Sequence, residues 1–71
     1  MTLRRYREET GLSLERFAKR TPLAKQTVSN AEAGRGVSYT TAIEILNALN
    51  QLRREEGQRE LKLDDLQLNI V

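Results

Sequence analysis

Hydrogen-bonding side chains concentrate in one short stretch of the sequence, AKQTVSNAEAG, which covers residues 24–34. If this stretch forms a helix, Ala24, Val28 and Ala31 share an apolar side. The opposite side carries Gln26, Ser29 and Asn30, extended by Ala33 and flanked by Lys25 and Thr27. An Asn or Gln amide both donates and accepts, which matches the paired groups on an adenine edge, whereas Lys donates to guanine. The pattern is typical of a helix that reads bases. The alternative is a merely solvated helix, for which Glu and Lys would have better helix propensity.

The composition argues against enzymatic chemistry. The chain contains no Cys and no His, which excludes disulfides, thiolate metal sites, Cys or His nucleophiles and the usual imidazole base. The carboxylate pairs Glu55–Glu56 and Asp64–Asp65 are adjacent in sequence, so their side chains face different directions on a helix. The segment GRG lacks the spacing and the strand context of a phosphate-binding loop. We therefore expect no enzyme, no cofactor and no metal.

The charge is distributed unevenly, although the net charge is only +2. Residues 1–36 carry +4 and residues 37–71 carry −2, and a basic first half suits a polyanion as well as an ordinary solvated surface. No apolar run approaches the roughly 18 residues of a membrane span, and MTLRRYREE has no apolar core of a signal peptide. The sequence predicts a cytoplasmic protein associated with the nucleoid, with no membrane partner.

The remaining segments predict helices that would position this stretch. TLRRYREET forms a short first helix closed by Gly11, and SLERFAKR begins at Ser13, a good N-cap, and is ended by Pro22. The third helix is residues 24–33, stopped by Gly34. The fourth, TTAIEILNALNQLRREE, carries a continuous apolar stripe of Ala42, Ile45, Leu46, Leu49 and Leu52.

The last segment is less regular. KLDDLQLNIV contains a short fifth helix or turn around residues 64–66, and its tail alternates as Leu66, Leu68 and Ile70, so it is alternatively a strand-like arm. The predicted fold is all-α, a compact bundle of four to five helices. We expect one domain over residues 1–71, with a core at about 3–52 and a linker and tail at 53–71.

The order and spacing of several landmarks resemble the phage-repressor family of helix-turn-helix proteins, also called Cro/C1-type or XRE-like, over residues 3–52. The landmarks are GLSL, FAK, TVSNAEAG and TAIEILNAL. The resemblance implies a lambda-repressor-like DNA-binding domain in which residues 24–33 form the recognition helix. Lys25, Gln26 and Asn30 would then meet base edges, and Thr27 would reach a base or a phosphate.

The resemblance also implies contacts outside the base edges. The residues expected along the DNA backbone are Ser13, Arg16, Ser29, Arg35, Ser38, Tyr39 and Thr40. Arg7 and Glu32 stand where the family often has an ion pair between the first and third helices, although two solvated surface charges are the alternative.

The sequence departs from the family at several positions. Pro22 occupies a turn position often held by Gly, and its locked φ requires a different turn. Ala24 replaces the usual Ser or Thr cap, so the cap is missing or comes from Thr21. Leu14 replaces a Gln that touches phosphate. The linker QLRREEGQRE is longer than usual, which we interpret as an extended fourth helix.

The predicted function is a sequence-specific transcriptional regulator, a repressor, that binds a palindromic site on double-stranded DNA as a homodimer. The candidate dimer surface is the helix around Leu52 with Leu66, Leu68, Ile70 and Val71, unless these residues complete the core. The alternative function is an antitoxin or adaptor whose main partner is a protein. The ending LNIV, without a cap, also leaves room for a further C-terminal domain.

Overall fold

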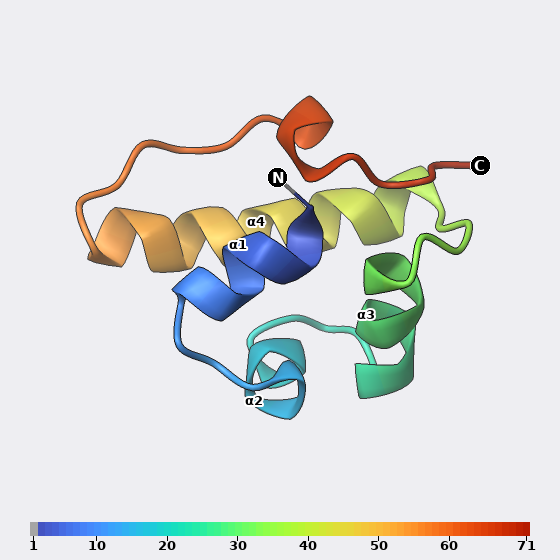
Figure 1. The fold of residues 1–71 in the computed structure, drawn as a ribbon, viewed down its shortest axis with the longest axis horizontal. Coiled ribbons are helices and arrows are strands. Elements are labelled where there is room, and N and C mark those ends of the chain that lie inside the picture. Colours follow the sequence, from blue (N-terminus) through green and yellow to red (C-terminus); the bar gives the residue numbers. More distant parts are fainter. Residues whose placement is uncertain (1) are drawn as a thin grey trace.

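Four α-helices and one short 3-10 helix make up the fold in a computed structural model that describes residues 2–71. The elements are α1 (Leu3–Glu9), α2 (Leu14–Lys19), α3 (Lys25–Glu32), α4 (Tyr39–Glu55) and η1 (Leu63–Leu66) (Figure 1). Residues 2–71 form no strand, only an isolated parallel bridge between Val37 and Ile70. The radius of gyration is 10.8 Å, near the roughly 11 Å of a compact domain of this length. The predicted all-α bundle is confirmed.

Serine side chains cap the first turns of α2 and α4. The Ser13 hydroxyl accepts the Arg16 amide N–H at 3.2 Å, and the Ser38 hydroxyl accepts the Thr41 amide N–H at 3.1 Å. Each bond satisfies one of the free N–H groups in the first turn of a helix. The helix predicted for residues 40–56 therefore begins one residue earlier, at Tyr39.

In residues 2–71 no helix is both long and apolar enough to cross a bilayer.

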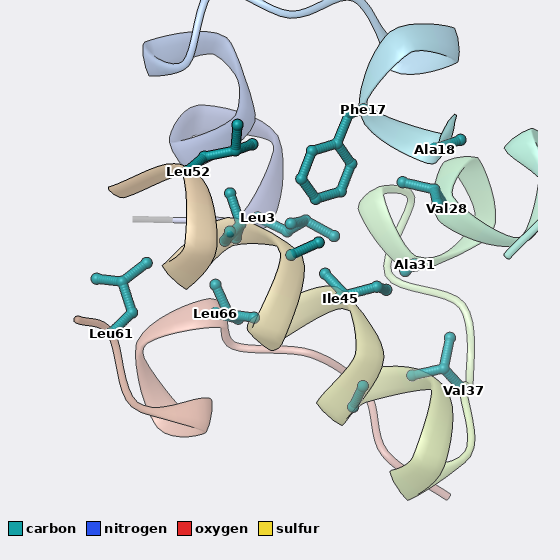
Figure 2. Packing of buried hydrophobic residues seen from close by; sticks show 13 residues of the cluster. Leu3, Phe17, Ala18, Val28, Ala31, Val37, Ile45, Leu52, Leu61 and Leu66 are labelled. Carbon is teal, nitrogen blue, oxygen red and sulfur yellow. The ribbon is translucent and has the colours of Figure 1, made fainter. Parts of the chain in front are cut away.

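The hydrophobic core lies on both sides of α4. Figure 1 shows α1, α2 and α3 on one side of α4 and the C-terminal segment returning along the other. Phe17, Val28 and Ile45 are fully buried at the first side, and Leu61 and Leu66 fill the second (Figure 2). The predicted stripe of α4 faces this core, with Leu46 only half-buried. Two sides of α4 are therefore covered, one by the first three helices and the other by the C-terminal segment.

The C-terminal segment corrects the expected extent of the fourth helix, and it selects one of the two roles that the sequence left open for Leu52 and Leu66. The linker is helical only as far as Glu55, because Gly57 adopts φ +71°, and residues 58–62 then run without regular structure. Leu66 is 1% exposed and Leu52 is 9% exposed, so these two candidate dimer residues belong to the core of the chain itself. Ile70 and Val71 stay exposed at 38% and 85%.

Candidate nucleic-acid interface

The turn between α2 and α3 is organised by Thr21. Its hydroxyl donates to the Ala18 carbonyl oxygen at 2.7 Å and accepts the Leu23 amide N–H at 3.0 Å. Pro22 is exposed in this turn, and its missing N–H is therefore not needed inside the fold. Ala24 is the N-cap of α3 and provides no side-chain hydrogen bond, while Thr21 bonds outside the helix. The side-chain cap of α3 is missing, and α3 is held by its packing.

Helix α3 is fixed by its apolar side and leaves its polar side free. Val28 is 0% and Ala31 4% exposed, and both pack into the core beside Phe17 (Figure 2). Lys25 and Gln26 are exposed, and Thr27, Ser29 and Asn30 are half-buried. The sorting of the side chains therefore follows the predicted helical period, with hydroxyls and amides directed away from the buried side.

Three polar side chains meet at the C-terminal half of α3. Gln26 Nε2 donates to Asn30 Oδ1 at 3.0 Å, and Arg35 Nη1 donates to the same oxygen at 2.8 Å. Gly34 brings Arg35 back to the helix: it adopts φ +84°, and the Arg35 amide N–H donates to the Asn30 carbonyl oxygen at 3.0 Å. This is the Schellman pattern, which is open mainly to Gly. Arg35, expected along the DNA backbone, thus lies against the residues expected to meet bases.

The other expected backbone residues lie at the N-termini of two helices. Ser13 and Arg16 are exposed at the start of α2, where Ser13 is the N-cap. Ser38 is the N-cap of α4 and also donates its hydroxyl to Thr41 Oγ1 at 3.0 Å. Tyr39 is 61% exposed, and Thr40 is exposed beside it. Amide N–H groups at helix N-termini attract anions, so these positions suit phosphate groups.

Arg7 and Glu32 form a mostly buried, bidentate ion pair between α1 and α3. Arg7 Nε donates to Glu32 Oε2, and Arg7 Nη2 donates to Glu32 Oε1 at 3.2 Å. Arg7 Nη1 also donates to the Leu12 carbonyl oxygen at 3.1 Å. The two side chains are 12% and 9% exposed. The hydrogen bond to Glu32 raises the pKa of Arg7, against a smaller opposing effect of burial. The pair sets the angle of α3 relative to α1.

Two asparagines of structural importance were missed by the sequence analysis. Asn50 is 6% exposed, and its amide donates to the Leu61 carbonyl oxygen at 3.0 Å and accepts the Leu61 N–H at 2.7 Å. The Asn69 side-chain amide donates to the Gly34 carbonyl oxygen at 3.4 Å. The backbone carbonyl of Asn69 accepts the Val37 N–H at 2.8 Å, and the backbone carbonyl of Val37 accepts the Val71 N–H at 2.9 Å. The alternating tail signalled a strand-like arm, but nothing in the sequence identified its partner. These contacts attach the arm to the loop that follows α3.

The matched family agrees with the geometry of α2, the turn and α3. No curated protein and no solved structure matches the chain. The family model described as a helix-turn-helix domain matches residues 1–59 of the 71. This range contains both helices, the turn organised by Thr21 and all of α4. In the structure α3, the second helix of the α2–α3 pair, is held by its apolar side and is open on its polar side. The chain belongs to the helix-turn-helix domain family.

Proposed function

We propose that the chain is a sequence-specific DNA-binding transcriptional regulator of the Cro/C1 type that represses its target. The observation that carries the proposal is the outward side of α3, where Gln26 and Asn30 present amides from a helix whose other side is buried. In a helix-turn-helix domain the second helix enters the major groove, and amides there pair with base edges. The regulator acts in the cytoplasm, on the nucleoid, and residues 1–71 serve as one DNA-binding domain.

The side chains divide into two functional groups in this proposal. Lys25, Gln26, Thr27 and Asn30 contact bases and select the sequence. Ser13, Arg16, Ser29, Arg35, Ser38, Tyr39 and Thr40 contact the DNA backbone and set position and affinity. Support for the second group comes from the two capped helix N-termini, at Ser13 and Ser38, which offer hydroxyls and amide dipoles to phosphates.

The regulator binds as a dimer, because one recognition helix reads too few base pairs to select a site in a genome. Two-fold symmetry requires a palindrome with half-sites about 34 Å apart. The dimer surface is reduced to the exposed end of the arm, Ile70 and Val71, since Leu52 and Leu66 are buried. Leu68 is half-buried against the core.

The decisive experiment is selection of bound duplexes from a random-sequence pool, at physiological salt, with variants of each group. We expect the native chain to enrich a palindrome with a spacing of about 10 base pairs. Gln26→Ala should lose about 1–3 kcal/mol on that palindrome and little on random DNA, whereas Arg16→Ala should weaken both. Asn47→Ala, on an exposed position of α4, is the control. If Gln26→Ala and Arg16→Ala each lost the same affinity for the palindrome as for random DNA, the division into base-contacting and backbone-contacting residues would be contradicted.

A second candidate function is an antitoxin or adaptor whose main partner is a protein. The observation that favours it is the presence of exposed apolar side chains outside α3, namely Tyr39, Ile70 and Val71. Aromatic and aliphatic anchors of this kind are typical of protein interfaces. A partner that binds without nucleic acid, and equally well to Gln26→Ala and Asn30→Ala, would support this candidate; absence of such a partner together with an enriched palindrome would exclude it.

A further inference from the structure

The amide of Asn30 is held in one orientation by two donors. Gln26 Nε2 and Arg35 Nη1 both donate to Asn30 Oδ1, at 3.0 and 2.8 Å. An amide oxygen has two lone pairs, so these two bonds fill its acceptor capacity. The Asn30 amide nitrogen donates no hydrogen bond within residues 2–71, and its two hydrogens remain free. Asn30 therefore offers donors only.

A donor-only side chain selects a different base from a free amide. An unconstrained Asn pairs with adenine, since it accepts from the N6 amino group while it donates to N7. Asn30 lacks the free acceptor for this pairing, but its donors match guanine, whose edge presents the acceptors N7 and O6. The guanidinium of Arg35 adds further donors beside it and no acceptor. Gln26 keeps its own oxygen and one amide hydrogen, which suits adenine.

We propose that Arg35 is a specificity-determining residue: by occupying Asn30 Oδ1 it makes Asn30 read guanine instead of adenine. This inference rests on the proposed DNA-binding function and names the base at one position of the site. The Schellman turn at Gly34 is what brings Arg35 to Asn30, through the bond from the Arg35 N–H to the Asn30 carbonyl. A basic residue in the loop thus acts on base choice through a residue of the helix.

The test is the random-sequence selection carried out with the native chain, Asn30→Ala and Arg35→Ala. Asn30→Ala identifies the base pair that Asn30 reads, as the position where preference disappears. At that position the native chain should favour guanine over adenine by about tenfold. Arg35→Ala leaves Asn30 Oδ1 with one bond and one free lone pair, so the preference there should shift to adenine. Arg59→Ala is the charge-matched control, because Arg59 is exposed in the linker that follows α4 and forms no bond to α3.

The outcomes separate this inference from the function on which it rests. If the native chain enriches no sequence, the proposed function fails. If it enriches a site but prefers adenine at the Asn30 position, the inference is wrong and the function stands. The inference is also overturned if Asn30→Ala changes no position, or if Arg35→Ala weakens binding uniformly and retains guanine. Circular dichroism of each variant verifies that helix content is unchanged before the selection.

Discussion

Arg7 and Glu32, 25 residues apart in sequence, share a bidentate ion pair that joins the first turns of the chain to the last turn of α3. Both side chains are largely buried, so water would solvate either charge poorly if its partner were removed. Because Arg7 also bonds the Leu12 carbonyl, the same guanidinium holds α1, the loop before α2 and α3 together. The ion pair therefore adds a polar link from α1 to the orientation that the packing of Val28 and Ala31 gives to α3.

Glu32→Gln should destabilise the fold by about 3 kcal/mol, since it leaves the Arg7 charge buried without its counter-charge. Urea denaturation measures this loss. Because the ion pair raises the pKa of Arg7, the stability that the charged guanidinium contributes is complete below the ordinary Arg pKa and is lost only as the pH rises above it. The destabilisation caused by Glu32→Gln should therefore be equal at about pH 6 and pH 9. Arg4→Ala is the control, because the Arg4–Glu8 pair is exposed and worth less than about 1 kcal/mol. If Glu32→Gln lowered the free energy of unfolding by as little as Arg4→Ala does, the interpretation of Arg7–Glu32 as a buried pair would be wrong.

Asn50→Ala should release the C-terminal segment from α4. The substitution leaves both the N–H and the carbonyl of Leu61 buried without partners, which costs about 2–3 kcal/mol. Hydrogen exchange at the Leu61 amide should accelerate by more than exchange in α2. Asn47→Ala, three residues earlier on the exposed side of the same helix, should change stability by less than about 0.5 kcal/mol. Unchanged protection of Leu61 would mean that packing alone holds the segment.

The helices could be predicted because their signals are local. Ser13 precedes α2 as its cap, Gly34 follows α3, and the apolar period of α4 alone indicates which side is buried. The outward side of α3 also follows from its period, since Val28 and Ala31 fix the inward side. These features are determined by residues within about one or two turns of each other.

The contacts that could not be predicted join residues distant in sequence or depend on side-chain orientation. Asn50 resembles any solvated residue of α4 until Leu61 returns to meet it, 11 residues later. The sequence left both a dimer surface and the core open to Leu66, because its burial depends on the path of residues 58–62. The bond from Arg35 to Asn30 requires a particular rotamer as well as the Gly34 turn. Composition and helical period contain no information on contacts between residues distant in sequence or on side-chain rotamers.

Gly34→Ala should cost about 1 kcal/mol of stability and should also alter DNA binding. A Cβ at Gly34 meets no atom within 4 Å, so the cost comes only from φ +84°. Relaxation of this strain moves Arg35 away from Asn30, so the base preference at the Asn30 position should shift from guanine toward adenine, as for Arg35→Ala. Gly57→Ala is a matched control: its φ is +71° and its Cβ also meets nothing, but it lies after α4. We expect equal thermal destabilisation by both variants and altered base preference only for Gly34→Ala. An altered preference in both would show a general effect of lowered stability.

Val71→Ser should separate dimer formation from folding. Val71 is 85% exposed, so its replacement should change the free energy of unfolding by less than about 0.5 kcal/mol, whereas Leu66→Ala should cost about 3 kcal/mol. If the end of the arm forms the dimer surface, Val71→Ser should weaken binding to a full palindrome and leave binding to a single half-site unchanged. Sedimentation equilibrium with each duplex measures both stoichiometry and affinity. Gln58→Ser, exposed in the linker, is the control. A dimer that tolerates Val71→Ser would exclude the arm as its interface, and the contact between copies would then have to come from another exposed surface.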